Sequence, residues 1–94
     1  MSFGTDIYRE IAAERERAHA KHGRTSMESM PVADLIRYTI LAEEVGEVAK
    51  EFNEAMARGH LDLAHLRTEC IQVAAMAAAW ADRIGAVLDG RVDQ

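Results

Sequence analysis

A row of glutamates stands out in the chain, because its spacing suits the binding of a divalent cation. The segment 41–55, LAEEVGEVAKEFNEA, carries Glu43, Glu44, Glu47, Glu51 and Glu54. Helical spacing places Glu44, Glu47 and Glu51 on one stripe that borders an apolar face. Like charges at these spacings repel one another, so the stripe is either a solvated surface or a cation site. Taken alone, the segment favours the solvated surface, since Lys50 follows Glu47 by three residues.

Glu69 changes this balance, because it falls inside an apolar stripe of the next helical segment. The residues nearest to it around the helix are Val73, Met76, Trp80 and Val87. A lone carboxylate in such surroundings is destabilising unless it is paired. His65 lies one turn before Glu69 and Gln72 nearly one turn after it, which forms a polar cluster. The alternative to a metal ligand is a capping glutamate or an ion pair with Arg67 or Arg83 of another chain. Together with the glutamate row, the cluster favours a metal site.

The two groups of residues meet if their segments are antiparallel helices joined by a short connection, because positions equally far from such a turn face each other. Glu47 and Glu51 lie about ten residues before the middle of the connection, and Glu69 and Gln72 lie a comparable distance after it. Oxygen ligands without cysteine favour Mg²⁺ or Mn²⁺. The histidines permit zinc, but they show no compact ligand spacing. We therefore predict a site for Mg²⁺, with Mn²⁺ as the alternative.

Helices are the elements that must position these groups. The composition is rich in Ala, Glu, Arg, Leu and Met, poor in aromatic residues, and includes Pro31 as the only proline. The first helix is expected to begin after Thr5 or Asp6, either of which can cap it, and to end near Gly23. The residues from 23 to 31 are expected to form a loop.

Two longer helices are expected to follow. Apolar residues recur at spacings of three and four over residues 32–58, which predicts an amphipathic helix. Gly59 is a natural stop, and Asp62 is placed to cap a third helix that ends near Leu88, before a polar tail. The short connection predicts an antiparallel helical hairpin, with the first helix flanking it.

A single hairpin leaves an apolar side open. The segment 73–81, VAAMAAAWA, is apolar all round, which is typical of a helix at the centre of an assembly. The 94 residues are expected to form one domain, 1–94, which buries only a modest share of its own surface. Two hairpins related by a two-fold axis would close a four-helix-bundle core. We therefore predict an all-α fold that assembles into a homodimer or homotetramer.

Charge and cysteine content argue against several classes of protein. Acidic residues number 16 and basic residues 11, which disfavours nucleic acid as a partner because that binding needs a clustered positive face. Cys70 is the only cysteine, so no intrachain disulfide is expected and a reducing cytoplasm fits. The N-terminus lacks a basic segment followed by an apolar core. We therefore expect neither a signal peptide nor a membrane-spanning helix, and we expect no membrane partner.

The two acidic clusters together resemble the MazG-like branch of the all-α nucleoside triphosphate pyrophosphohydrolases. In that family an EExxE motif on one helix is followed by ExxD on the next. The matching residues here are Glu43, Glu44, Val45, Gly46 and Glu47, then Glu69, Cys70, Ile71 and Gln72. The resemblance covers residues 14–84. It includes the stretch ERERAHAKHG, which is similar to a basic segment in some small phage and bacterial members.

The resemblance implies a Mg²⁺-dependent hydrolase that cleaves a nucleoside triphosphate to the monophosphate and pyrophosphate, with removal of non-standard nucleotides as an expected role. Glu44, Glu47 and Glu69 match its metal ligands, and Gln72 takes the place of the fourth. Glu43 matches the first acidic position and, with Glu47, is expected to act in catalysis by orienting ligands or water.

The residues expected to bind substrate are Arg17, Lys21, His22 and Lys50. For Arg17, Lys21 and His22, which lie in the first helix, an ordinary solvated basic patch is an alternative of equal weight to substrate binding. Trp80 is placed either to stack on a base or to anchor the core, and its apolar stripe favours the core.

Gln72 is the departure from the family pattern, because an aspartate is expected there and a neutral amide holds Mg²⁺ less strongly. The alternative function is therefore a catalytically weakened relative that acts as a nucleotide-binding or protein-binding helical oligomer. A purely structural helical oligomer is a third interpretation, against which the cluster around Glu69 argues.

Overall fold

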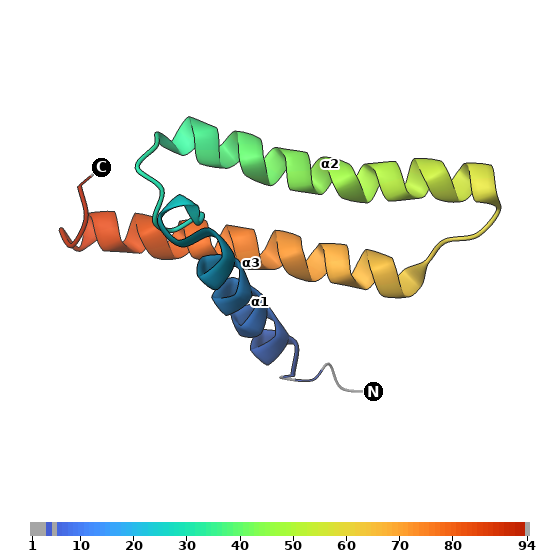
Figure 1. Ribbon diagram of the computed structural model, residues 1–94, viewed down its shortest axis with the longest axis horizontal. Coiled ribbons are helices and arrows are strands. Elements are labelled where there is room, and N and C mark those ends of the chain that lie inside the picture. Colours follow the sequence, from blue (N-terminus) through green and yellow to red (C-terminus); the bar gives the residue numbers. More distant parts are fainter. Residues whose placement is uncertain (1–3, 5, 94) are drawn as a thin grey trace.

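The computed structural model describes Gly4 and residues 6–93, and these residues form three α-helices (Figure 1). The elements are α1 (Asp6–His22), a short 3-10 helix η1 (Gly23–Thr25), α2 (Asp34–Arg58) and α3 (Leu63–Leu88). The described residues contain no β-strand, so the predicted all-α class is confirmed. Thr5, one of the two predicted capping residues, lies outside the described residues. The second helix begins at Asp34, slightly later than predicted, because Ala33 still has extended backbone angles.

α2 and α3 form the predicted antiparallel hairpin (Figure 1). Gly59 ends α2 with a φ of 84°, in the left-handed region where a residue with a side chain is strained. Asp62 caps α3, since its carboxylate accepts a hydrogen bond from the backbone N–H of His65 at 3.1 Å. These two local signals place the second half of α2 beside the first half of α3.

α1 packs across α3, as Figure 1 shows. Two ion pairs join the helices: Arg15 Nη2 lies 2.9 Å from Asp82 Oδ2, and Arg67 Nη1 donates to Glu10 Oε1 at 2.8 Å. Both pairs lie at the surface, where solvent screens them, so each contributes little to the stability of the fold. Arg67 is therefore engaged within the chain.

The core of a single chain is thin. The buried apolar side chains among the described residues are Met27, Ala75, Ala79 and Ala86. The chain exposes 6846 Å², whereas a compact protein of this size exposes about 5,400 Å². Its radius of gyration, 15.2 Å, likewise exceeds the value of about 12.4 Å for a compact chain of this length. One hairpin and one flanking helix therefore leave much surface in solvent.

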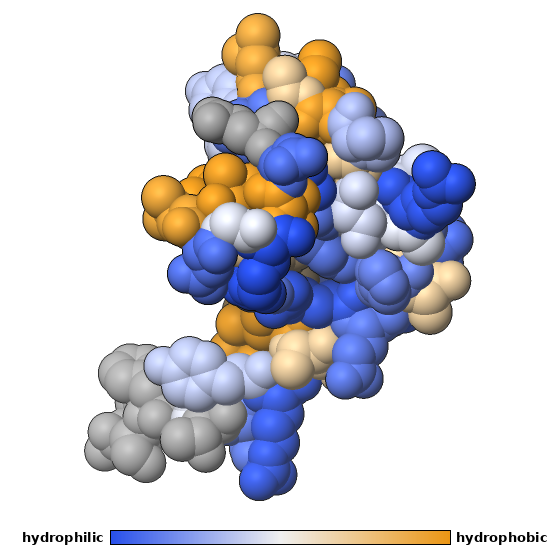
Figure 2. Space-filling view, turned by 90° about the vertical axis from the view of Figure 1, so that its left-hand side faces the viewer, coloured by the Kyte–Doolittle hydropathy of each residue, from blue (hydrophilic) through white to orange (hydrophobic). Residues whose placement is uncertain are grey.

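Apolar side chains that are exposed or half-buried form two rows along the hairpin, which together we call the free face. The row on α2 consists of Leu35, Tyr38, Ala42, Val45, Ala49, Phe52 and Met56. The row on α3 consists of Leu63, Leu66, Cys70, Val73, Ala77, Trp80 and Ile84. The middle of each row lies more than about 100° around its helix from the middle of the residues that line the cavity described below, although Val73 and Trp80 lie nearer to the lining residue Met76. Figure 2 shows hydrophobic surface gathered toward one side of the molecule and hydrophilic surface toward the other.

α3 has the length and composition of a membrane-spanning helix, which the sequence analysis did not anticipate. The core helix of a helical assembly has the same apolar character. Glu69 and Arg83 lie within α3, and a bilayer disfavours charged side chains at such positions.

Candidate functional site

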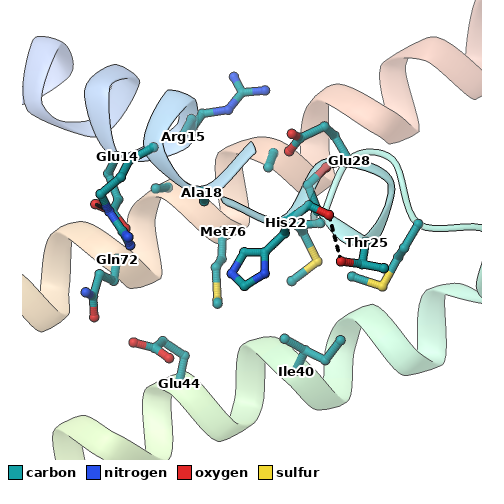
Figure 3. A pocket seen from close by; sticks show the side chains of 16 residues that line it. Glu14, Arg15, Ala18, His22, Thr25, Glu28, Ile40, Glu44, Gln72 and Met76 are labelled. Atoms are coloured by element: carbon teal, nitrogen blue, oxygen red, sulfur yellow. Dashed lines mark hydrogen bonds and ion pairs between the residues drawn. The ribbon is translucent and has the colours of Figure 1, made fainter. Parts of the chain in front are cut away.

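A cavity of about 330 Å³ lies between α1, the connection to α2, and the facing sides of α2 and α3 (Figure 3). Its apolar lining residues are Ala18, Met27, Met30, Ile40, Ala75, Met76 and Ala79. Its polar lining residues are Glu14, Arg15, Arg17, His22, Thr25, Ser26, Glu28, Glu44 and Gln72. This volume lies at the small end of the range of ligand sites, and the mixture of apolar surface with a few polar groups is typical of them. We call this cavity the pocket.

Four of the residues predicted to form the site line the pocket: Glu44, Gln72, Arg17 and His22. Figure 3 shows Glu44 on α2 and Gln72 on α3 on opposite sides of the same opening. The antiparallel hairpin is what brings these two helices face to face, and the crossing of α1 adds Arg17 and His22 from a third side.

Glu44 lies in a partly buried and acidic environment. Its pKa is raised above 4.5, first because burial disfavours the charged form, and then because of the negative charge of Glu69 and a hydrogen bond with that carboxyl group. The charges of Glu47 and Glu14 raise the pKa of Glu44 further. Glu44 and Glu69 thus compete for a single neutralising proton or cation, which is typical of carboxylates at functional sites.

Glu69 and Glu51 are both partnered by a histidine. His65 Nε2 lies 3.0 Å from Glu69 Oε1 and 3.7 Å from Glu51 Oε2. Arg58 Nη2 also donates to Glu51 Oε1 at 3.1 Å. Of the polar cluster predicted around Glu69, His65 contacts Glu69, whereas Gln72 faces the pocket. The buried Glu51 is engaged by two basic groups, which leaves it less available to a cation.

The remaining predicted site residues lie at the periphery. Glu47 is exposed, although it is close enough to raise the pKa of Glu44. Glu43, Lys21 and Lys50 are exposed and are not part of the pocket lining. Lys50 Nζ lies 3.9 Å from Glu54 Oε1, as in an ordinary surface ion pair. The structure therefore brings Glu44 close to Glu69, and it places Gln72 with Glu44 in the lining of the pocket.

The structure adds Glu14 to the site, which sequence reasoning missed. Arg17 Nε donates to Glu14 Oε2 at 2.9 Å and its Nη2 donates to Oε1 at 2.5 Å. The hydrogen bond to Arg17 is the main reason why the pKa of Glu14 is lowered. The spacing of three residues between Glu14 and Arg17 is visible in the sequence. Their orientation toward Glu44 is not visible there, because it depends on how α1 crosses α3.

The donor atoms suit a divalent cation. Glu44 and Glu69 supply carboxylate oxygens and Gln72 an amide oxygen, which are ligands that Mg²⁺ accepts, with water completing its shell. Within the described part of the chain, no three acidic, histidine or cysteine side chains surround one point in the manner of a metal site. Binding through Glu69 is open to the carboxylate oxygen that does not contact His65, since the contact involves Oε1 alone.

Comparison with known proteins identifies no relative. No family model, curated protein or solved structure matches the chain significantly.

Proposed function

We propose that this protein is a Mg²⁺-dependent nucleoside triphosphate pyrophosphohydrolase, for which Mn²⁺ is an alternative metal. The observation that supports this most is the position of Glu44, whose pKa is raised by burial and then by the charge of Glu69, beside a pocket that also contains Gln72 and Arg17. A divalent cation relieves the repulsion between two such carboxylates. The apolar part of the pocket offers space for the nucleoside.

In this proposal acidic residues hold the metal and a water molecule, while basic residues hold the phosphates. The metal ligands are Glu44, Glu47, Glu69 and Gln72. When bound, the cation neutralises phosphate oxygens and lowers the pKa of a water molecule. Glu43 and Glu47 orient the water that attacks phosphorus. The proposed phosphate-binding residues are Arg17 and His22, which line the pocket, and Lys21 and Lys50, which lie outside its lining. Of these, Arg17 exchanges its contact with Glu14 for a phosphate oxygen.

A catalytically weakened relative is the alternative. Two observations favour it: Gln72 supplies no negative charge, and His65 lies within 3.0 Å of the Glu69 carboxylate. Such a protein would bind a nucleotide in the pocket, or a protein partner, without releasing pyrophosphate.

A screen of ribonucleoside and deoxyribonucleoside triphosphates for pyrophosphate release, with Mg²⁺ and with Mn²⁺, tests the proposal. We expect the wild type to yield the nucleoside monophosphate and pyrophosphate in equal amounts. Binding of a nucleotide without hydrolysis would support the weakened relative. Neither binding nor hydrolysis across the panel would contradict both interpretations.

We also propose that two copies of the chain pair through their free faces, as a homodimer or as the unit of a homotetramer. The chain exposes 6846 Å², about 1,400 Å² more than a compact protein of its size. A standard interface removes about 800 Å² from each partner, so the excess is sufficient for a stable dimer. Two hairpins then share one four-helix core, and α3 lies inside it.

The α2 row of the free face has the spacing of a coiled-coil seam. From Leu35 to Met56 its members follow one another at intervals of three and four residues. The positions that flank the row are uncharged: Thr39, Gly46 and Asn53. Two copies can therefore meet without like-charge repulsion, and Ala42 and Ala49 permit a close approach of the helices. The pocket lies on the side of the hairpin opposite the free face, so it stays open to a nucleotide when two copies pair. In this proposal the protein acts in the cytoplasm and has no nucleic-acid or membrane partner.

A further inference from the structure

A buried arginine of α2 holds the connection between α1 and α2. Arg37 is 1% exposed. Its Nε donates to the carbonyl oxygen of Met27 at 2.9 Å, and its two terminal nitrogens donate to the carbonyl oxygens of Met30 and Val32. Asp34 Oδ1 lies 3.8 Å from the guanidinium group. The side chain is thus directed at the backbone of the connection.

α3 contributes two more side chains to the same region. Arg83 Nη1 donates to the carbonyl oxygen of Glu28 at 3.0 Å. Trp80 Nε1 donates to Asp34 Oδ1 at 3.0 Å, which joins α3 to the first turn of α2. Backbone N–H groups of the connection pair with the carbonyl oxygens of Gly23, Ser26 and Met30. The hairpin supplies side-chain donors to the carbonyl oxygens of Met27, Glu28 and Val32.

Burying Arg37 is unfavourable in itself. Burial, followed by the nearby charge of Arg83, lowers the pKa of Arg37 below its ordinary value. An apolar side chain at this position would avoid that penalty but would leave three carbonyl groups without these donors. The hydrogen bonds fix one wall of the pocket, since Ser26, Met27, Glu28 and Met30 all line it.

We infer that Arg37 is a positioning residue, which holds the wall formed by residues 26–30 so that the pocket exists before its ligand arrives. Arg37 does not itself line the pocket, and its nitrogens are engaged by the backbone. Arg37 therefore affects how tightly the ligand binds, and it does not act on the metal. A wall that is already ordered reduces the entropy lost on binding. The inference rests on the proposed function only for the identity of the ligand, a nucleoside triphosphate.

Limited digestion with trypsin examines the wall directly. Arg24 lies in η1 beside the wall and Arg58 lies at the hairpin turn, and both are exposed. In Arg37→Met we expect cleavage after Arg24 to be about tenfold faster, with cleavage after Arg58 unchanged, because the connection opens locally. Arg37→Lys keeps a charged donor, so its rate of cleavage after Arg24 is expected to lie between those of the wild type and Arg37→Met. The matched control is Arg9→Met, which removes an exposed arginine of α1 and should be cleaved after Arg24 and after Arg58 at the wild-type rates.

Kinetics of pyrophosphate release give a second readout, which a purely structural role would not produce. We expect Arg37→Met to raise KM about tenfold while kcat stays within about twofold, and Arg37→Lys to recover part of the loss. If Arg37→Met does not fold, Arg37→Lys carries the comparison alone.

Equal acceleration of cleavage after Arg24 and Arg58 would overturn the inference, because it denotes a general loss of stability. Unchanged cleavage at both sites, or an unchanged KM in an active variant, would also overturn it. If the wild type hydrolyses no nucleotide, the proposed function fails, while the digestion still decides whether Arg37 holds the wall.

Discussion

The two faces of the α2–α3 hairpin differ in a way that a single chain does not explain. The face toward the pocket is rich in ionic and polar groups and is partly covered by α1. The free face is apolar and open, with Phe52 48% and Met56 84% exposed. A monomer in water normally buries its large apolar side chains and leaves charges outside. α1 has 17 residues and covers only the face toward the pocket. We propose that a second copy of the chain covers the free face.

The largest effect is expected from a charge at the centre of the free face. Val45→Glu would place two carboxylates close together in the dimer without a partner. Because unpaired buried charges are strongly destabilising, we expect the dimer dissociation constant to rise about 100-fold or more. Sedimentation equilibrium measures this constant.

Ala20→Glu is the control for this experiment, since it adds the same charge at an exposed position of α1. It should leave the dimer intact. A wild type that remains monomeric at micromolar concentration would remove the proposed explanation for the difference between the faces.

A substitution on the pocket face should affect chemistry without affecting assembly. Glu69→Gln removes the charge that faces Glu44, so we expect pyrophosphate release to fall about 100-fold at fixed Mg²⁺. Glu54→Gln makes the same chemical change in a surface ion pair and should retain the wild-type rate. Equal losses in the two variants would show that no specific site exists around Glu69. Sedimentation of both variants should match that of the wild type.

A smaller effect is expected from pH. The pKa of Glu44 is raised in the folded state, so the fold favours the protonated form. The stability that this provides is present below the unfolded pKa of about 4.5 and is lost as the pH rises through the raised folded value. Without metal, Glu44→Gln should therefore resist urea better than the wild type near pH 7, at one fixed protein concentration. Near pH 4 this advantage should be lost. The same difference at both pH values would show that Glu44 is not under electrostatic strain.

Local signals made the hairpin predictable, whereas the connection before it was not. Gly59 and Asp62 each specify a helix end through their own backbone or side chain, so neither depends on distant residues. The contact between His65 and Glu69 likewise follows from helical spacing. Arg37 gives no such signal, because a buried arginine and a solvated one look alike in a helical pattern.

The candidate site could be predicted only in part. The spacing of the acidic residues predicted that Glu47 and Glu51 face Glu69 and Gln72. In the structure, burial and then the charge of Glu69 raise the pKa of Glu44, and Glu51 contacts His65. The part contributed by Glu14 and by the segment 26–30 depends on the angle at which α1 crosses α3. The contacts between these helices join residues far apart in the chain, as the ion pair between Arg15 and Asp82 does. No local pattern encodes that angle.

The central claim is that Glu44, Glu47, Glu69 and Gln72 share a divalent cation, and calorimetric titration with Mn²⁺ tests it most directly. Gln72→Asp replaces a neutral amide with a carboxylate, so we expect Mn²⁺ to bind about tenfold more tightly than to the wild type. Glu69→Gln removes a charged ligand, and we expect binding about tenfold weaker. Equal affinity in the wild type and both variants would contradict the account.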